Sequence, residues 1–235
     1  MNDEMNTPMV PEPEPAGFSS WFSTWMDAVT KPSEQTYARI ASSSNAKVST
    51  AFLWVFIGSL VNAFVGSLMQ GPMMEQFMQQ LGVEGLPAGA TSPTLLSVVC
   101  GAPIGAVVGV VFFAAFTGVV QWVARLLGGT GTFEQLAYVF AAITVPFTLI
   151  SSVFTLFAAV PYVGACFGLL GLALALYAIY LELMAVKAVN QIGWGQAAGA
   201  LFLPGIVIFC CIAAVVAGLV SFFIPVIQET IPQIN

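Results

Sequence analysis

Five apolar stretches, each long enough to cross a lipid bilayer, constrain this chain more than any other feature. They cover residues 48–69, 95–124, 136–159, 162–185 and 199–227. A membrane-spanning helix needs about 20 mostly apolar residues. With 58% hydrophobic and 7% charged residues, the 235-residue chain also lacks the polar surface of a water-soluble globule. The sequence therefore predicts an all-α fold, a polytopic integral membrane bundle of five transmembrane helices.

The basic residues predict how the chain is threaded. All five Lys and Arg residues precede the first stretch or lie in the connections after the second and the fourth: Lys31, Arg39, Lys47, Arg125 and Lys187. Basic residues near span ends are retained on the cytoplasmic side. We therefore expect the N-terminus in the cytoplasm and, after five spans, the C-terminus outside.

The chain divides into four segments by composition. Residues 1–16 alternate Pro with Glu and predict a disordered acidic tail in the cytoplasm. Residues 17–47 predict short amphipathic helices on the cytoplasmic side. Residues 48–227 form the five-span membrane domain, and residues 228–235 form a short outer tail.

An aromatic face marks the segment before the first span. Four aromatic side chains recur at helical spacing: Phe18, Trp21, Phe22 and Trp25. Such a face is suited to the membrane interface, where Trp is enriched, so we predict that these four are membrane-interface anchors. The alternative is that the face packs on the protein's own cytoplasmic loops.

Catalytic chemistry has few candidates. The chain contains no His, the commonest general base and metal ligand. All four cysteines fall in predicted spans without metal-ligand spacing. We therefore predict no enzyme, no catalytic or metal-binding residues and no cofactor, and the scarcity of basic residues argues against nucleic acid as a partner. Cys100 and Cys166 lie at similar depths, so a disulfide is conceivable, with buried free thiols as the alternative.

Polar side chains inside the spans are the candidate functional positions. Glu182 is the only acidic residue in a span. In the structural interpretation it snorkels or pairs with Arg125 or Lys187 at the same level. In the functional interpretation it is a protonatable carboxylate that is coupled to transport.

A second set of polar side chains lies on one face of the third span: Thr144, Thr148, Ser151 and Thr155. Hydroxyls in this position bond back to their own helix or to a neighbouring span. Alternatively, they line a narrow polar path together with Asn62.

Small residues predict how the helices pack. Gly101, Gly105 and Gly109 recur every four residues in the second span, which lets two helix backbones approach closely. We favour packing inside the chain over a dimer face, although a homo-oligomer stays open. The turn after this span contains three glycines and then Thr132 and Gln135, which form a helix-capping pattern rather than a phosphate cradle. A similar order around Lys187 and Gln196 suggests a parallel repeat of two hairpins.

These residues also carry a family resemblance. Its elements are the segment with Pro32, the five spans, the Leu127–Gln135 turn, Tyr138 followed by Pro146, the Pro161–Gly164 turn, and Lys187 with Ala188. Over roughly residues 25–225 the chain resembles the Yip (Ypt-interacting protein) domain family, and it is more similar to the prokaryotic members. The resemblance implies a five-span fold with a cytoplasmic N-terminus in a prokaryotic cell membrane. Eukaryotic relatives are linked to Rab-type GTPases and vesicle traffic, but their Asp-Leu-Tyr-Gly-Pro stretch is absent here.

Two function classes follow from the sequence. The first is a non-enzymatic membrane scaffold or adaptor, which acts through membrane or cytoplasmic protein partners or through membrane organisation. The alternative is a small permease or channel that uses the polar face of the third span and Glu182. The lipid bilayer is a partner in both.

Overall fold

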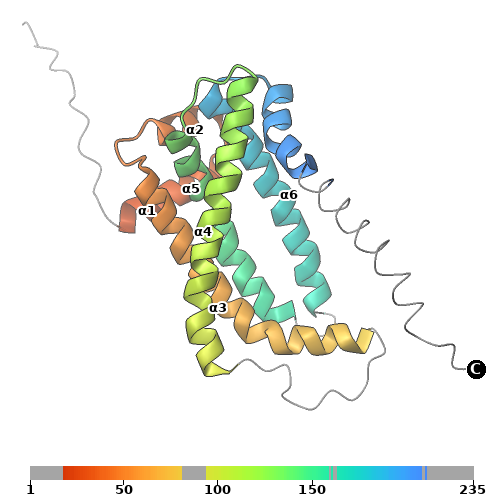
Figure 1. Cartoon of the computed structure of the whole chain (residues 1–235). Helices are drawn as coiled ribbons and strands as arrows, with labels where there is room; N and C mark the ends of the chain where they lie inside the picture. Colours follow the sequence, from red (N-terminus) through yellow and green to blue (C-terminus); the bar gives the residue numbers. More distant parts are fainter. Residues whose placement is uncertain (1–17, 81–93, 159, 161–162, 208–209, 211–235) are drawn as a thin grey trace, which may run out of the picture.

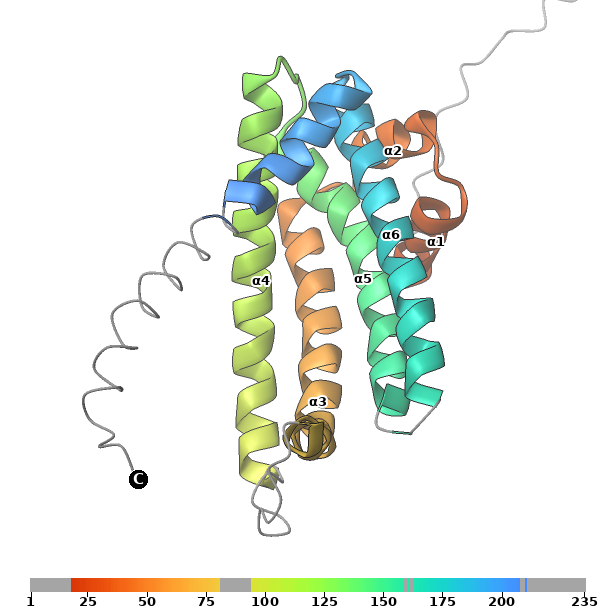
Figure 2. The same ribbon diagram turned by 90° about the vertical axis from the view of Figure 1, so that its right-hand side faces the viewer.

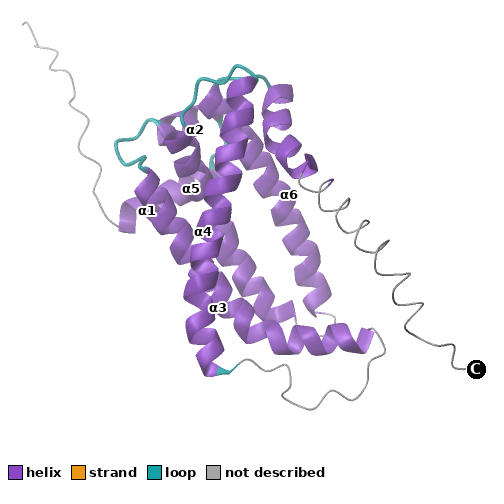
Figure 3. Cartoon of the chain, viewed as in Figure 1, coloured by secondary structure: helices purple, strands orange, loops and turns teal. Residues whose placement is uncertain are grey.

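The computed structural model describes residues 18–80, 94–158, 160, 163–207 and 210, and every statement below refers to these residues. Within them all regular structure is helical (Figure 3). The helices are α1 (Phe18–Thr30), α2 (Glu34–Ala41), α3 (Val48–Gln80), α4 (Leu95–Leu126), α5 (Phe133–Ala158) and α6 (Val163–Asn190), followed by a helix over Trp194–Val207.

Four helices are long and apolar enough to cross a membrane. They contain the candidate spans Val48–Gly71, Val98–Leu126, Phe133–Phe157 and Val163–Asn190, which confirm the first four predicted stretches. The fifth stretch is described only at its start, as part of the apolar helix Trp194–Val207. The rest of that stretch and the two terminal tails lie outside the described residues.

The four long helices lie side by side, and α3 runs between α4 and α5 (Figure 2). The far part of α3 turns across one end of this bundle (Figure 1). At the opposite end, α1 and α2 pack on α5, and α2 also packs on α6. These two helices are therefore part of the folded body rather than a separate arm.

The core lies in the half of the bundle that α1 and α2 cover. Its central helix is α5, in which every residue from Leu136 to Ile143 is at most 2% exposed. Trp54 of α3 and Tyr37 of α2 are fully buried against this part of α5. Apolar side chains in the other half of α4 and α6 are largely exposed, as expected for surfaces that face lipid.

Glycines let α4 approach α3 closely. A Cβ atom on Gly109 would lie 2.7 Å from Ser59 Oγ, and one on Gly105 would lie 3.2 Å from Ala63 Cβ. No atom lies within 4 Å of the corresponding position on Gly101. Packing inside the chain is thus confirmed for Gly105 and Gly109, because helix backbones approach where both sides carry small residues.

The three cysteines that the structure describes are unpaired. Cys100 and Cys166 are both free and exposed, so a disulfide between them is not formed. Their similar depth did not bring them together because α4 and α6 are separated over much of their length by α3 and α5 (Figure 2).

Candidate functional site

The structure gathers the ends of several helices at one end of the bundle, together with α1 and α2 (Figure 1). The first backbone N–H of α3, on Val48, donates to Glu134 Oε1 at the start of α5, at 3.2 Å. The turn after α4 meets the end of α6, where Thr130 N donates to Asn190 O at 3.1 Å. All five Lys and Arg residues belong to these segments. We call this assembly, formed by residues 18–48, 125–135 and 187–196, the basic end.

The turn between α4 and α5 is built for close packing. Thr132 N donates to Gln135 Oε1 at 3.1 Å, and Gln135 N donates to Thr132 Oγ1 at 3.2 Å, so the predicted capping box is confirmed. A Cβ on Gly129 would lie 2.8 Å from Ala124 O, and one on Gly131 would lie 2.7 Å from Val189 O. The two glycines are therefore needed for the approach of backbone to backbone.

A buried pair of amide side chains joins this turn to α6. Gln121 Nε2 donates to Asn190 Oδ1 at 2.8 Å and to Gly131 O at 2.7 Å. Asn190 Nδ2 donates to Gln121 Oε1 at 3.3 Å and to Val186 O at 3.2 Å. All four amide N–H bonds of the pair thus have acceptors. Sequence reasoning missed both residues, although an amide inside or beside an apolar stretch is a signal for such a contact.

The two basic residues considered as partners of Glu182 make other contacts. Lys187 forms an ion pair with Glu34 of α2, and its ammonium group lies 4.7 Å from the centre of the Trp194 ring. Arg125 Nε donates to Gly131 O at 3.3 Å. The predicted pairing of Glu182 with Arg125 or Lys187 is therefore wrong. Residues five apart on a helix face different directions, and Lys187 faces α2.

Glu182 instead lines a lateral pocket of about 370 Å³ between α4, α6 and the helix Trp194–Val207. The side chain of Glu182 forms no hydrogen bond and no ion pair among the described residues. The pocket is lined by Phe116, Ile179, Glu182, Leu201, Phe202, Gly205 and Ile206. In the part of the lining that the structure describes, it combines a carboxyl group with the rings of Phe116 and Phe202 in otherwise aliphatic surroundings.

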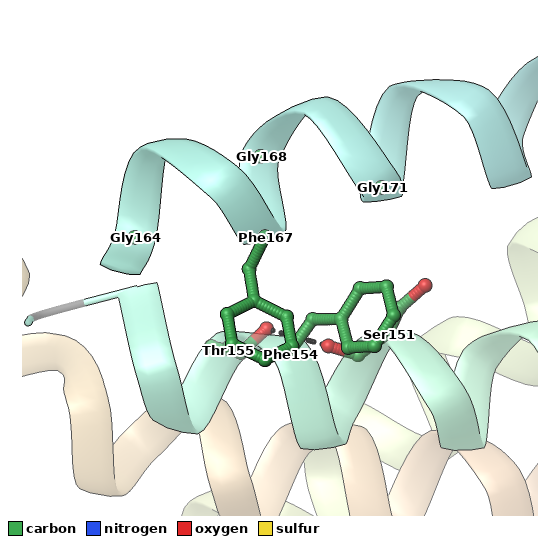
Figure 4. A pocket seen from close by; sticks show the side chains of 7 residues that line it. All are labelled: Ser151, Phe154, Thr155, Gly164, Phe167, Gly168 and Gly171. Carbon is green, nitrogen blue, oxygen red and sulfur yellow. Dashed lines mark hydrogen bonds between the residues drawn. The ribbon is translucent and has the colours of Figure 1, made fainter. Parts of the chain in front are cut away.

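The hydroxyl groups of α5 bond to their own helix. Thr148 Oγ1 donates to Thr144 O at 2.9 Å, and Thr155 Oγ1 donates to Ser151 O at 2.9 Å. Ser151 and Thr155 line a shallow pocket of about 220 Å³ against α6. In this pocket Phe167 points from α6 toward α5, near Phe154 and Thr155 (Figure 4).

Asn62 contacts a different position of α5. Its Oδ1 lies 3.2 Å from Ser152 Oγ, and that hydroxyl group also lies 2.8 Å from Thr148 O. Ser152 is buried, whereas Asn62 and Ser151 are exposed. Asn62 thus meets α5 at Ser152, which lies about 100° around the helix from Ser151. The polar path of Asn62 with the Thr144–Thr155 face stays a prediction.

The aromatic face of α1 is divided between the core and the surface. Trp21 and Trp25 both pack edge-on against Trp54 of α3, with ring centroids 5.9 and 5.6 Å apart. Trp25 is 8% exposed, whereas Phe22 and Met26 are 55% and 45% exposed. The side chain of Phe18 lies outside the described part of the structure. The interfacial role of the four aromatic residues stays a prediction, and Phe22 is the most exposed of those whose side chains are described.

Two tyrosine hydroxyl groups fasten the end of α1. Tyr37 Oη donates to Ala28 O at 2.8 Å, and Tyr177 Oη donates to Val29 O at 2.7 Å. Burial raises the pKa of Tyr37 well above its usual range, and the nearby Tyr177 and Tyr180 add to the shift. This hydroxyl group therefore stays protonated and able to donate.

An ionic contact links α1 to α2. Asp27 accepts from Lys31 Nζ and from Arg39 Nη2, both at 2.8 Å. The hydrogen bond from Lys31, followed by that from Arg39, holds the pKa of Asp27 below its usual value against the opposing effect of burial.

Four span-length apolar helices and a packed N-terminal segment define a multi-pass α-helical membrane protein. The family model of the Yip1 domain matches residues 26–228, so the chain belongs to the Yip1 domain family and the sequence resemblance is confirmed. No curated protein and no solved structure matches the chain.

Proposed function

We propose that this protein is a non-enzymatic membrane scaffold or adaptor, and that its basic end is the part that acts on protein partners or on the membrane. The observation that carries this proposal is the docking of α1 on the bundle. Trp21 and Trp25 anchor the helix from one side, which leaves Phe22 and Met26 exposed on a surface of defined shape. An exposed apolar pair on an ordered helix is typical of an interaction surface.

The proposed orientation places the basic end in the cytoplasm. All five Lys and Arg residues belong to this end, and the positive-inside rule assigns such an end to the cytoplasmic side. The resemblance to prokaryotic members supports the prokaryotic cytoplasmic membrane as the location. In this orientation Phe22 and Met26 are available to cytoplasmic proteins and to the headgroups of the inner leaflet.

The contacts inside the bundle favour this function over a permease or channel. The hydroxyl groups of Thr148 and Thr155 are used within α5, and the contact of Asn62 is with Ser152. Glu182 faces a pocket at the side of the bundle. A transport path needs polar groups that continue along one route, and these groups lie on separate surfaces.

The test is crosslinking in the native membrane, followed by purification in mild detergent. The change is Phe22→Ser with Met26→Ser, and the matched control is Ser19→Ala with Ser23→Ala on the same helix. We prefer these variants to deletion of residues 1–47, because deletion would remove Trp25 and Tyr37 from the core.

For an adaptor, a stoichiometric partner should crosslink to the wild type and to the control but not to the Phe22 and Met26 variant. If the surface instead acts on lipid, the same variant should lose binding of the isolated 17–31 peptide to vesicles. Recovery of the chain alone from every variant, together with unchanged peptide binding, would contradict the proposal. Solute flux in proteoliposomes, compared between wild type and Glu182→Gln, would then test transport.

A further inference from the structure

The pocket beside Glu182 has a composition that the scaffold function does not use. Its carboxyl group, from Glu182 on α6, shares the pocket with Phe116 of α4 and Phe202 of the following helix. Phe116 stacks on Phe140 of the core, with ring centroids 6.4 Å apart, so its position is supported from behind. Phe202 and Ile206 are exposed, so the outer wall of the pocket is an apolar surface of the kind that faces lipid.

The side chain of Glu182 leans along α6 away from the basic end. Side chains on a helix lean toward its N-terminus, and the N-terminus of α6 lies at the end opposite the basic end (Figure 2). Glu182 precedes Asn190 by eight residues, which is about 12 Å along the helix at 1.5 Å per residue. An unpaired carboxylate at this depth is costly, so a cationic hydrogen-bond donor would stabilise it strongly.

We propose that the Glu182 pocket binds the ammonium group of a membrane amphiphile. The carboxylate of Glu182 accepts hydrogen bonds from the ammonium group, and Phe116 and Phe202 line the pocket around it, since a carboxylate with aromatic neighbours favours cations over neutral groups. A volume of about 370 Å³ admits a small headgroup. The alkyl chain stays in the bilayer and leaves the pocket past Phe202 and Ile206.

Single-chain amines and phosphatidylethanolamine are two kinds of membrane amphiphile that carry a primary ammonium group and no carboxylate, which Glu182 would repel. Both present the same hydrogen-bond donors, and the phosphate group of the phospholipid must also be accommodated near the carboxylate. The experiment therefore compares them with each other and with an uncharged amphiphile of the same chain length.

The test uses the full chain in phosphatidylglycerol nanodiscs and a long-chain amine that carries a photoreactive diazirine group. We expect labelling of peptides that contain Ile179–Glu182 or Phe202–Ile206. Unlabelled octadecylamine should compete at least about tenfold better than octadecanol, because hydrogen bonds to charged groups contribute that much or more. If phosphatidylethanolamine competes as well as octadecylamine, the site is assigned to aminophospholipid. If phosphatidylethanolamine competes less well, the site is assigned to single-chain amines.

Three variants make the test specific. Glu182→Gln keeps the size of the side chain, removes its charge and should lower labelling about tenfold. Gly205→Leu fills the pocket, and because no atom lies within 4 Å of a Cβ at this position, the variant should fold and lose labelling. Glu134→Gln removes a carboxylate at the basic end and should label like the wild type.

The proposal is overturned if octadecanol competes as well as octadecylamine. It is equally overturned if labelling at these peptides persists in Glu182→Gln, or in a Gly205→Leu variant that is monodisperse and has wild-type thermal stability.

Discussion

Replacement of Asn190 by Leu tests how the basic end is held together. The side chain of Asn190 is fully buried, and the variant loses its three hydrogen bonds to Gln121 and Val186. Gln121 Nε2 keeps Gly131 O as an acceptor, but Gln121 Oε1 loses its only donor among the described residues. An orphaned buried polar group costs about 1–3 kcal/mol, so we expect the free energy of unfolding to fall by about 2–3 kcal/mol.

The pairwise part of this loss can be isolated with Gln121→Leu and the double variant. Each single variant leaves one amide without its partner, whereas the double variant removes both amides. The double variant should therefore be less destabilised than the sum of the singles, by at least about 1 kcal/mol. Interhelical hydrogen bonds in membrane proteins average about 0.6 and reach about 1.7 kcal/mol. We expect the upper end because this pair is fully satisfied and shielded from water and lipid.

The assay is reversible unfolding in mixed micelles with increasing SDS, followed by circular dichroism and Trp fluorescence. Asn62→Leu is the matched control, because Asn62 is exposed and its neighbour Ser152 keeps an acceptor in Thr148 O. This control should lower the free energy of unfolding by less than about 0.5 kcal/mol. Additivity of the Asn190 and Gln121 variants within about 0.5 kcal/mol would refute the reasoning, because it would mean that the two amides act independently.

Three further predictions concern helix packing and the N-terminal helices. Gly109→Ala should lower the free energy of unfolding by about 1–3 kcal/mol in the same assay, because its Cβ would overlap Ser59, whereas Gly101→Ala should be neutral or slightly stabilising. Tyr37→Phe should lower the free energy of unfolding by about 1 kcal/mol and speed hydrogen exchange in α1, and unchanged exchange would contradict the anchoring role. Ultraviolet titration of the folded wild type should show the Tyr37 phenol still protonated at pH 11. The lowered pKa of Asp27 contributes stability above about pH 4, and this stability is lost as the pH falls through the pKa of the folded protein. Between pH 6 and pH 3 the free energy of unfolding of the wild type should therefore fall by at most about 1 kcal/mol more than that of Asp27→Asn.

The span positions and the capping box could be predicted because both depend on residues that are close in sequence. Bilayer thickness sets the length of an apolar stretch whatever its neighbours are. The reciprocal bonds of Thr132 and Gln135 are made within a single turn. Contacts of this kind are determined before the tertiary fold is known.

The contacts of the basic end could not be predicted because they join distant parts of the chain. Gln121 and Asn190 are 69 residues apart, and Tyr177 and Val29 are 148 residues apart. Helical spacing correctly placed Trp21 and Trp25 on one face of α1, but it could not reveal that Trp54 covers that face. Glu182 shows the same difficulty, because its position within an apolar stretch does not reveal which side of the bundle it faces.

A repeated capping contact explains how the basic end acts as one unit. Gln196 Oε1 accepts from Gly193 N at 2.9 Å, which matches the contact that Gln135 makes with Thr132. Gln196 Nε2 then donates to Leu127 O at 2.9 Å, so the cap of the later helix also holds the turn after α4. Gly193 has no hydroxyl group to return the bond, so the second cap is one-sided. The amide pair holds that turn to α6 from inside the bundle, and Gln196 holds it from outside. A change at Gln196 or at Asn190 should therefore loosen the same turn. Because this turn holds α6 beside the start of α5, and α1 and α2 pack on these two helices, the surface of α1 and α2 also depends on it.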